Sequence, residues 1–100
     1  MRIGAHVSSA GGPHTAFPKA AAMGAEALQV FLSAPQQWRL PALSVEQVEA
    51  FITARVEAAI PVFTHAIYLI NFGSQDEAIL EKSVASLGSY LDWAGRLGIE

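Results

Sequence analysis

Three short apolar segments, at residues 2–7, 26–32 and 61–64, alternate along this chain with longer segments of helical pattern. Each apolar segment has the length of a buried strand and is too short for a buried helix. The stretches between them place apolar side chains three and four positions apart, as over residues 45–59, which is typical of an amphipathic helix. Strands that alternate with helices pair in parallel through right-handed crossovers. We therefore predict an α/β fold in which three parallel strands are each followed by a helix.

Proline and glycine mark the boundaries of the first predicted helix, over residues 13–23. Pro13 suits its first turn, and Gly24 suits the position directly after its end. Pro18 lies inside this range and removes a backbone donor, so it indicates either a kink or a later start of the helix.

Capping residues mark the other two helices. Ser44 and Gln47 have the spacing of a capping box before the second helix, and Ser74 and Glu77 have the same spacing before the third, which ends at Gly98. The periodicity predicts that one face of the third helix is formed by Ile79, Leu80, Val84, Leu87, Leu91 and Ala94.

A sheet of only three parallel strands leaves unpaired hydrogen-bonding groups at its edges. The chain has 100 residues, whereas a (β/α)8 barrel typically needs roughly 250. We therefore expect residues 1–100 to form the first three β/α units of a TIM barrel, and the chain to stop just before a fourth strand.

The composition excludes several classes of protein. Hydrophobic residues make up 52% of the chain, as is typical of parallel strands buried on both faces. No apolar run reaches the length of about 18 residues that a transmembrane helix needs, and the first run breaks too early for a signal peptide, so we expect a cytoplasmic protein with no membrane partner. Cysteine is absent, which excludes disulfides and thiolate zinc sites, and the net charge of -3 provides no overall basic field for a nucleic acid.

The carboxyl end of the third strand carries the main functional candidate, His65. Parallel sheets bind ligands at the carboxyl ends of their strands. Because side chains alternate along a strand, His65 shares a face with Phe63, and on the interior face of a barrel its imidazole would point toward the mouth. There a ring nitrogen can bind zinc. The alternative is a structural histidine that hydrogen-bonds to the neighbouring backbone.

Tyr68 and Leu69 follow on the loop after this strand, where large apolar side chains are costly to expose. On an exposed loop they could wedge into a gap in DNA or stack on a base. The alternative is that both fold back onto the third helix as a small satellite cluster.

The loop after the second strand combines two amides, an aromatic ring and a cation, in Gln36, Gln37, Trp38 and Arg39. That mixture suits contacts with phosphate and sugar. The alternative is a tryptophan that anchors its loop, with Arg39 in solvent.

The end of the first strand carries His6 and Ser8, followed by small residues that would let another backbone approach closely. Both lie near the same predicted end of the sheet. We interpret His6 as a buried histidine whose ring nitrogens are satisfied within the core.

Three motifs narrow the interpretation: GAHVS at residues 4–8 followed by a glycine pair at 11–12, QWR at 37–39, and HAIYLIN at 65–71. Together they resemble the motifs of the endonuclease IV family of apurinic/apyrimidinic endonucleases. They occur in the family's order, the first at the end of a predicted strand and the other two after one. They cover essentially all of this chain but only the first part of a family member.

The resemblance implies a xylose isomerase-like TIM barrel that holds a cluster of three zinc ions. It implies hydrolysis of the phosphodiester 5′ to abasic sites in double-stranded DNA, by an enzyme that is a monomer when full length. His65 matches a zinc ligand of the family, and Tyr68 and Leu69 match the residues that the family inserts at the abasic site. Gln36 stands where the family commonly has an arginine, so it cannot supply that charge. The other zinc ligands belong to later strands, and we expect the chain alone to be inactive.

Two other functions remain open from the sequence. A sugar isomerase or epimerase can use the same type of barrel, because a fold does not by itself define a function. The chain could also be a barrel piece without catalytic residues. The Tyr68–Leu69 pair and the Gln37–Trp38 loop favour the nuclease over the isomerase or epimerase.

Overall fold

The computed structural model describes residues 1–100. Three short strands form one parallel sheet in the order β1-β2-β3: β1 (Gly4–His6), β2 (Ala27–Val30) and β3 (Val62–Thr64). Backbone pairing continues beyond these bounds, because the N–H of Val7 donates to Gln29 O at 2.9 Å and the N–H of His65 donates to Val30 O at 2.9 Å. The predicted sequential parallel sheet is therefore confirmed.

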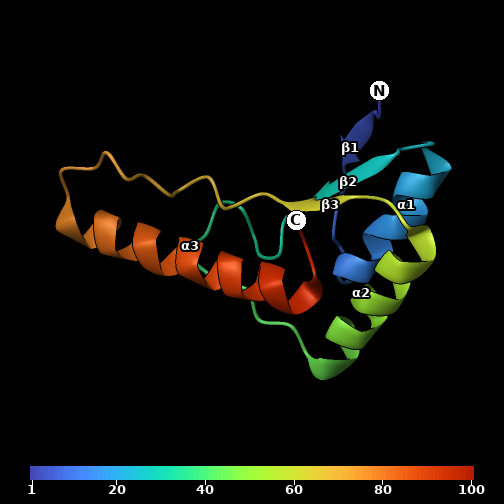
Figure 1. The fold of residues 1–100 in the computed structure, drawn as a ribbon. Helices are drawn as coiled ribbons and strands as arrows, with labels where there is room; N and C mark the ends of the chain where they lie inside the picture. Colours follow the sequence, from blue (N-terminus) through green and yellow to red (C-terminus); the bar gives the residue numbers. More distant parts are fainter.

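A helix follows every strand, as predicted. The helical elements are η1 (Pro13–Thr15) and α1 (Ala16–Ala22), α2 (Val45–Ala58), and α3 (Glu77–Leu97). Figure 1 shows α1 and α2 beside the sheet, while α3 reaches far beyond it, under the long loop that follows β3. The α/β class and the βαβαβα order are confirmed.

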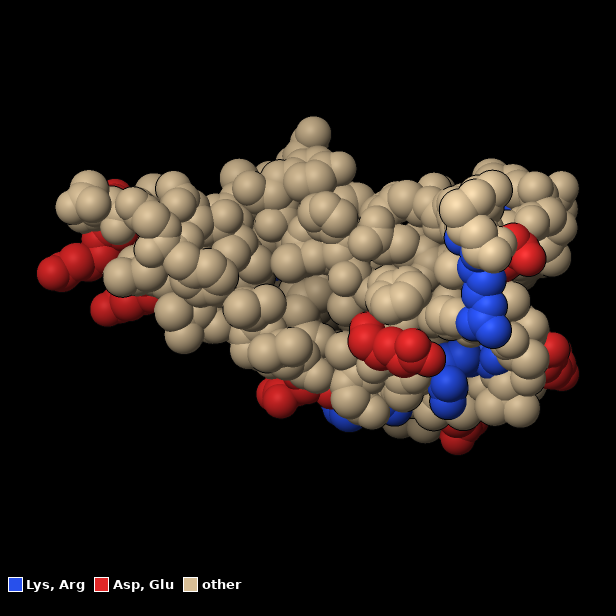
Figure 2. Space-filling model, turned by 45° about the horizontal axis from the view of Figure 1, so that its top comes forward, with Lys and Arg blue, Asp and Glu red and all other residues tan.

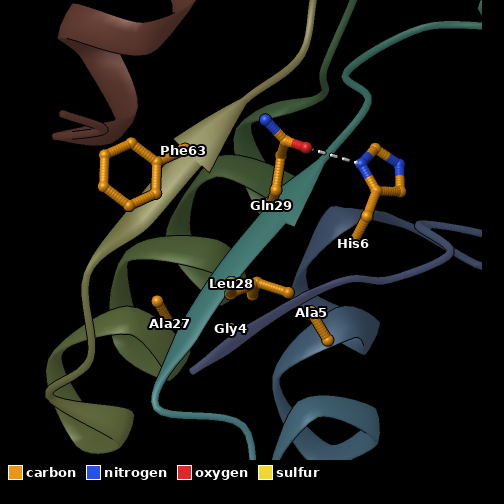
Figure 3. A pocket seen from close by; sticks show the side chains of 7 residues that line it. All are labelled: Gly4, Ala5, His6, Ala27, Leu28, Gln29 and Phe63. Atoms are coloured by element: carbon orange, nitrogen blue, oxygen red, sulfur yellow. Dashed lines mark hydrogen bonds between the residues drawn. The ribbon is translucent and has the colours of Figure 1, made fainter. Parts of the chain in front are cut away.

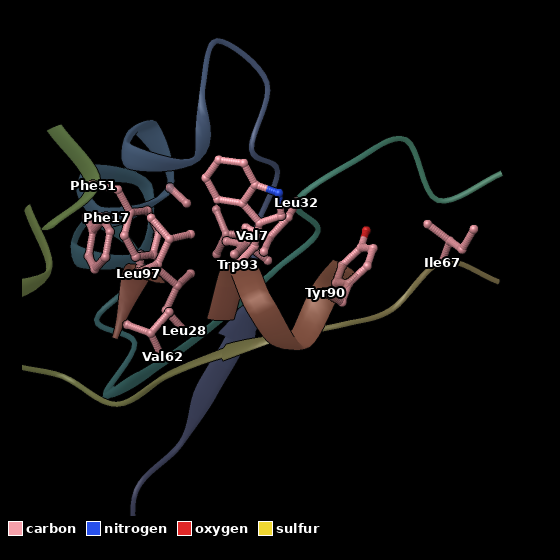
Figure 4. Packing of buried hydrophobic residues seen from close by; sticks show 13 residues of the cluster. Val7, Phe17, Leu28, Leu32, Phe51, Val62, Ile67, Tyr90, Trp93 and Leu97 are labelled. Atoms are coloured by element: carbon pink, nitrogen blue, oxygen red, sulfur yellow. The ribbon is translucent and has the colours of Figure 1, made fainter. Parts of the chain in front are cut away.

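The core lies between the helices and one face of the sheet. The edge of the Phe17 ring in α1 meets Phe51 in α2 at a centroid distance of 5.2 Å. Leu28 and Val62 from the sheet join them, and Ile67 carries the cluster outward along the loop after β3 (Figure 4). Fully burying one such side chain contributes about 1.5–3 kcal/mol to folding. Only this face of the sheet is covered, so the alternate residues lie open.

The first helix differs in detail from the prediction of one continuous helix over residues 13–23. A turn of 3-10 helix comes first, and α1 begins at Ala16. Pro18 is therefore the third residue of α1, where a backbone N–H has no acceptor within the helix and its loss costs nothing. Of the two alternatives for Pro18, the later start of the helix is therefore correct. Gly24 follows the helix with φ of 71°, the left-handed conformation that glycine favours after a helix.

One of the two predicted capping boxes is present. Ser44 Oγ accepts from the N–H of Gln47 at 3.2 Å, and Gln47 Oε1 accepts from the N–H of Ser44 at 3.1 Å. The box at Ser74 and Glu77 is wrong. The cap of α3 is Asp76, whose carboxylate accepts two backbone N–H groups at 2.9 and 3.3 Å. A carboxylate is a strong acceptor that also favours the positive end of the helix dipole, so α3 begins at Glu77.

The apolar face that periodicity indicates on α3 is not the face that is buried. Leu80, Val84 and Leu91 are 37%, 59% and 64% exposed. The face that is buried consists of Ser83, Ser86, Tyr90, Trp93 and Leu97. A helix on the outside of a barrel has apolar side chains both toward the sheet and toward its neighbours, and periodicity alone does not say which stripe faces the sheet.

The outer edge of β3 is partly occupied by the last residue of the chain. The N–H of Glu100 donates to Val62 O at 3.1 Å, in the manner of a further parallel strand. Beside it runs a groove between β3 and α3, lined by Thr64, Ala66, Leu87, Leu91 and Ala94 among others. Part of the exposed stripe of α3 therefore faces this groove.

Candidate functional site

Four rings gather where the strands end, and we call them the ring cluster: His6, Phe31, His65 and Tyr68. They come from β1, from the residue after β2, and from the loop after β3. Phe31 is central, with ring centroids 4.7 Å from His6, 5.0 Å from His65 and 5.3 Å from Tyr68. His6 and His65 are 6.0 Å apart, so the three strand ends converge on one site.

His65 lies at the carboxyl end of β3 and is exposed on the open face of the sheet, where the sequence places it. Its Nδ1 lies 2.6 Å from Ala66 O. Because a carbonyl oxygen only accepts, Nδ1 carries the proton of the neutral ring and Nε2 keeps a free lone pair. A nitrogen prepared in this way can bind a metal ion. That role stays a prediction.

His6 is exposed, so its interpretation as a buried core histidine is wrong. It points to the open face together with Gln29, its neighbour in the register of β1 and β2. Figure 3 shows the bond between them, in which His6 Nδ1 lies 3.0 Å from Gln29 Oε1. The amide oxygen can only accept, so the free nitrogen of neutral His6 is again Nε2. Alternation puts His6 on the side of the sheet that no helix covers.

The loop after β3 is held at several points. The N–H of Tyr68 donates to Pro35 O at 2.9 Å, the N–H of Asn71 donates to Ser83 Oγ at 2.9 Å, and the side chain of Ile67 is buried. Such a loop can present side chains in a fixed direction. The bond from Tyr68 to Pro35 therefore joins the loop after β3 to the loop after β2.

Tyr68 and Leu69 project from this loop and are 61% and 36% exposed. The ring of Tyr68 contacts Phe31 and His65 at the strand ends. The alternative in which Tyr68 folds back onto the third helix is therefore wrong. An exposed ring on an anchored loop can stack against a ligand that approaches the strand ends.

The loop after β2 exposes Gln36, Gln37 and Arg39, while Trp38 is half-buried and packs against the core. The ammonium of Lys82 lies 5.9 Å from the centre of the Trp38 ring. Trp38 therefore anchors its loop, as the alternative stated, and its polar neighbours still face solvent. Their contact with DNA stays a prediction.

Ser8, the other candidate after β1, is exposed. Its Oγ accepts from the N–H of Ala10 at 3.2 Å, and its carbonyl oxygen accepts from Lys19 Nζ at 3.0 Å. Ser8 thus shapes the first loop. Its hydroxyl is occupied within the loop, and the structure does not bring it into the ring cluster.

Charge is unevenly distributed over the molecule. Figure 2 shows Asp and Glu side chains at both ends of the molecule, whereas Lys and Arg gather toward the end opposite the tip where α3 begins. Most of the face between them is uncharged. Recognition at the strand ends would therefore depend on rings, amides and single cations such as Arg39.

A metal ion would need ligands beyond those brought together here. No three His, Asp or Glu side chains lie close enough to hold one ion. His65 fits as a single zinc ligand, since one of its ring nitrogens is held by a carbonyl and the other is free.

Sequence reasoning missed Phe31 and Gln29. Phe31 continues the alternation of Gln29 along β2, so a period of two predicts that both share the open face with His6 and His65. That signal was present, but only the register between the strands shows that these residues meet.

The sequence profile described as xylose isomerase-like TIM barrel matches residues 17–100, and the chain therefore belongs to this family. Within it, the resemblance to endonuclease IV is confirmed by relatives. The probable endonuclease 4 of Streptomyces avermitilis is 48% identical over 86 residues, which cover 85% of this chain and 28% of the relative. The endonuclease 4 of Thermus thermophilus is 44% identical over 102 residues, which cover 99% of this chain and 37% of the relative.

A solved structure agrees with the fold. The crystal structure of endonuclease IV from Thermus thermophilus superimposes with a TM-score of 0.93 at 44% identity, and covers 100% of this chain and 38% of that one. The fold is thus the βαβαβα portion of a TIM barrel, as predicted. The chain spans about a third of the length of the relatives that it matches. None of its helices combines the length and the apolar character that crossing a membrane requires.

Proposed function

We propose that this chain forms the first three β/α units of a zinc-dependent endonuclease that hydrolyses the phosphodiester 5′ to abasic sites in double-stranded DNA. The observation that carries the proposal is the position of His65, at a strand end and with Nε2 free, in a chain similar over its whole length to endonuclease IV. The bond from Glu100 to Val62 supports a fourth strand that pairs with β3 in the complete barrel.

His65 is the residue of this chain that would hold zinc. Ala66 O fixes the orientation of its ring, as hydrogen bonds to the second nitrogen do in most zinc histidines. The other ligands come from parts of the barrel outside these residues. A bound zinc cluster supplies Lewis-acid stabilisation of the phosphate and an activated water.

DNA is contacted by the second and third loops. Tyr68 and Leu69 are exposed side by side on an anchored backbone, so they are suited to fill the gap that a missing base leaves in the stack. Gln36, Gln37 and Arg39 are exposed on the neighbouring loop and are suited to contact the phosphate backbone. The bond from Tyr68 to Pro35 keeps the two loops in one arrangement.

A sugar isomerase or epimerase on the same barrel is the second candidate. The exposed Tyr68–Leu69 pair and the names of the relatives favour the nuclease.

The test is zinc analysis of the complete enzyme with His65→Ala. His65 is not part of the hydrophobic core cluster, so the substitution leaves that core intact; zinc content and cleavage of an abasic duplex should both fall, while the midpoint of urea unfolding of zinc-free protein changes little. The control is His14→Gln, which removes a half-buried imidazole in η1, outside the ring cluster. If His65→Ala retains all of its zinc and wild-type cleavage, His65 is structural and the proposal fails.

A further inference from the structure

Phe31 occupies the centre of the ring cluster without being a candidate ligand for metal or DNA. Its ring centroid lies 4.7 to 5.3 Å from those of the other three rings, whereas the centroid of His65 lies 5.8 Å from that of Tyr68 and 6.0 Å from that of His6. The Phe31 and Tyr68 rings meet at 87°, and the Phe31 and His65 rings at 57°. Edge-to-face and tilted contacts of this kind favour particular relative orientations of the rings.

The backbone of Phe31 is itself fixed by the neighbouring loops. Its carbonyl oxygen accepts from Ser9 Oγ at 2.9 Å, and the carbonyl oxygen of the preceding Val30 accepts from the N–H of His65 at 2.9 Å. The first loop and β3 therefore both hold this segment in place. A ring on such a support is a rigid surface for its neighbours.

His65 and Tyr68 need that surface because both are exposed. The only hydrogen bond to the His65 side chain is the one to Ala66 O, which restricts the ring but does not enclose it. The Tyr68 side chain forms no hydrogen bond, so its direction depends on ring contacts. An exposed side chain that is not held loses rotational freedom when a ligand binds, which weakens binding.

We propose that Phe31 is a positioning residue that orients both the zinc ligand His65 and the DNA-contacting Tyr68, and so links the metal site to the DNA site. This inference rests on the proposed function. It assigns to a residue that touches neither metal nor DNA a measurable effect on the binding of both.

The test uses the complete enzyme with Phe31→Leu and Phe31→Met, which keep an apolar side chain but remove the ring. Zinc affinity is measured by chelator competition. DNA affinity is measured by fluorescence anisotropy with a duplex that carries a tetrahydrofuran abasic analogue. The linkage 5′ to the analogue is a methylphosphonate, which the enzyme cannot hydrolyse. We expect each affinity to fall about 2- to 10-fold, because side chains released from a fixed orientation must be ordered again when the ligand binds. Phe31→Tyr keeps the ring and should retain both affinities.

The matched control is Phe63→Leu. Phe63 lies on the same face of the sheet, two residues before His65, but it is not part of the ring cluster. If the losses came only from removing an aromatic ring from this face, Phe63→Leu would cause them as well. Because Phe63 is outside the ring cluster, we expect Phe63→Leu to leave both affinities unchanged. The inference is overturned if the Phe31 variants bind zinc and DNA like wild type, if only one affinity falls, or if Phe63→Leu produces the same losses.

His65→Ala in the same assays separates this inference from the proposed function. If that variant keeps its zinc affinity, the zinc site is not at His65 and the proposed function fails, whatever Phe31 does. If it loses zinc while the Phe31 variants behave like wild type, only the positioning role of Phe31 fails.

Discussion

Tyr68→Ala and Ile67→Ala, in adjacent residues of the loop after β3, should have opposite effects in the complete enzyme. Tyr68 is 61% exposed, whereas Ile67 is 3% exposed. The backbone bond from Tyr68 to Pro35 O is unaffected when its side chain is shortened. Tyr68→Ala should therefore cost at most about 1 kcal/mol of unfolding free energy, since only partly solvated ring contacts are lost.

The same substitution should weaken binding of abasic DNA. Loss of one stacking contact costs about 1–3 kcal/mol, which corresponds to roughly 5- to 150-fold in affinity. Zinc content should not change, because His65 keeps its bond to Ala66 O and its contact with Phe31. Ile67→Ala should show the reverse, with a loss of about 2–5 kcal/mol in stability from the cavity it leaves.

Urea unfolding measures the unfolding free energy of each variant, and fluorescence anisotropy with the uncleavable abasic duplex measures its affinity for abasic DNA. Binding of Ile67→Ala is measured without urea, at a low temperature at which it remains folded. If Tyr68→Ala binds the duplex as tightly as wild type, its ring is not a DNA contact. If it unfolds as readily as Ile67→Ala, the ring belongs to the core and the reasoning from exposure is refuted.

Two further predictions concern the loop and the chain by itself. Ser83→Ala removes the acceptor of the Asn71 N–H, a partly buried hydrogen bond, so unfolding should become easier by about 0.5–1.5 kcal/mol in a urea titration, and an unchanged midpoint would contradict the role given to this bond. The 100-residue chain alone should not cleave an abasic duplex and should aggregate through its open sheet edges, as light scattering would show; zinc-dependent cleavage by the purified chain would refute this.

Features that depend on a few neighbouring residues could be predicted from the sequence. The Ser44–Gln47 box is formed within one turn of helix, and the glycines after α1 and α3 have left-handed conformations that follow from the absence of a side chain. At Ser74 the same reasoning failed because a stronger acceptor, Asp76, lies two residues further on. Local rules compete, and the pattern alone does not rank them.

The buried face of α3 could not be predicted because its partners are distant in sequence. Tyr90 hydrogen-bonds to Ser33 at 2.8 Å across 57 residues, and the indole N–H of Trp93 donates to Pro41 O at 2.9 Å across 52. These bonds allow a partly polar stripe to face the core, while a more apolar stripe is exposed. Periodicity shows where apolar side chains lie on the helix. It does not show which distant residues will hydrogen-bond to polar side chains and so allow them to be buried.

Only part of the candidate site could be predicted, because its residues come from different strands. Alternation along one strand places His65 at the strand end and on the open face. The meeting of His65 with His6 and Phe31 depends instead on the register, in which His6 lies opposite Gln29 and Gln29 lies opposite Phe63. No single segment contains that information, so His6 was assigned to the wrong side of the sheet.

The sequential order of the sheet has a consequence for synthesis on the ribosome. Each strand pairs with the one made just before it, so a nascent chain never waits for a later segment in order to add the next strand. Every new β/α unit finds its template already folded, and the loop closed at each step is short compared with the whole barrel. Each newly added strand leaves an open edge until the next one pairs with it, and unpaired strand edges make incompletely folded chains prone to aggregate.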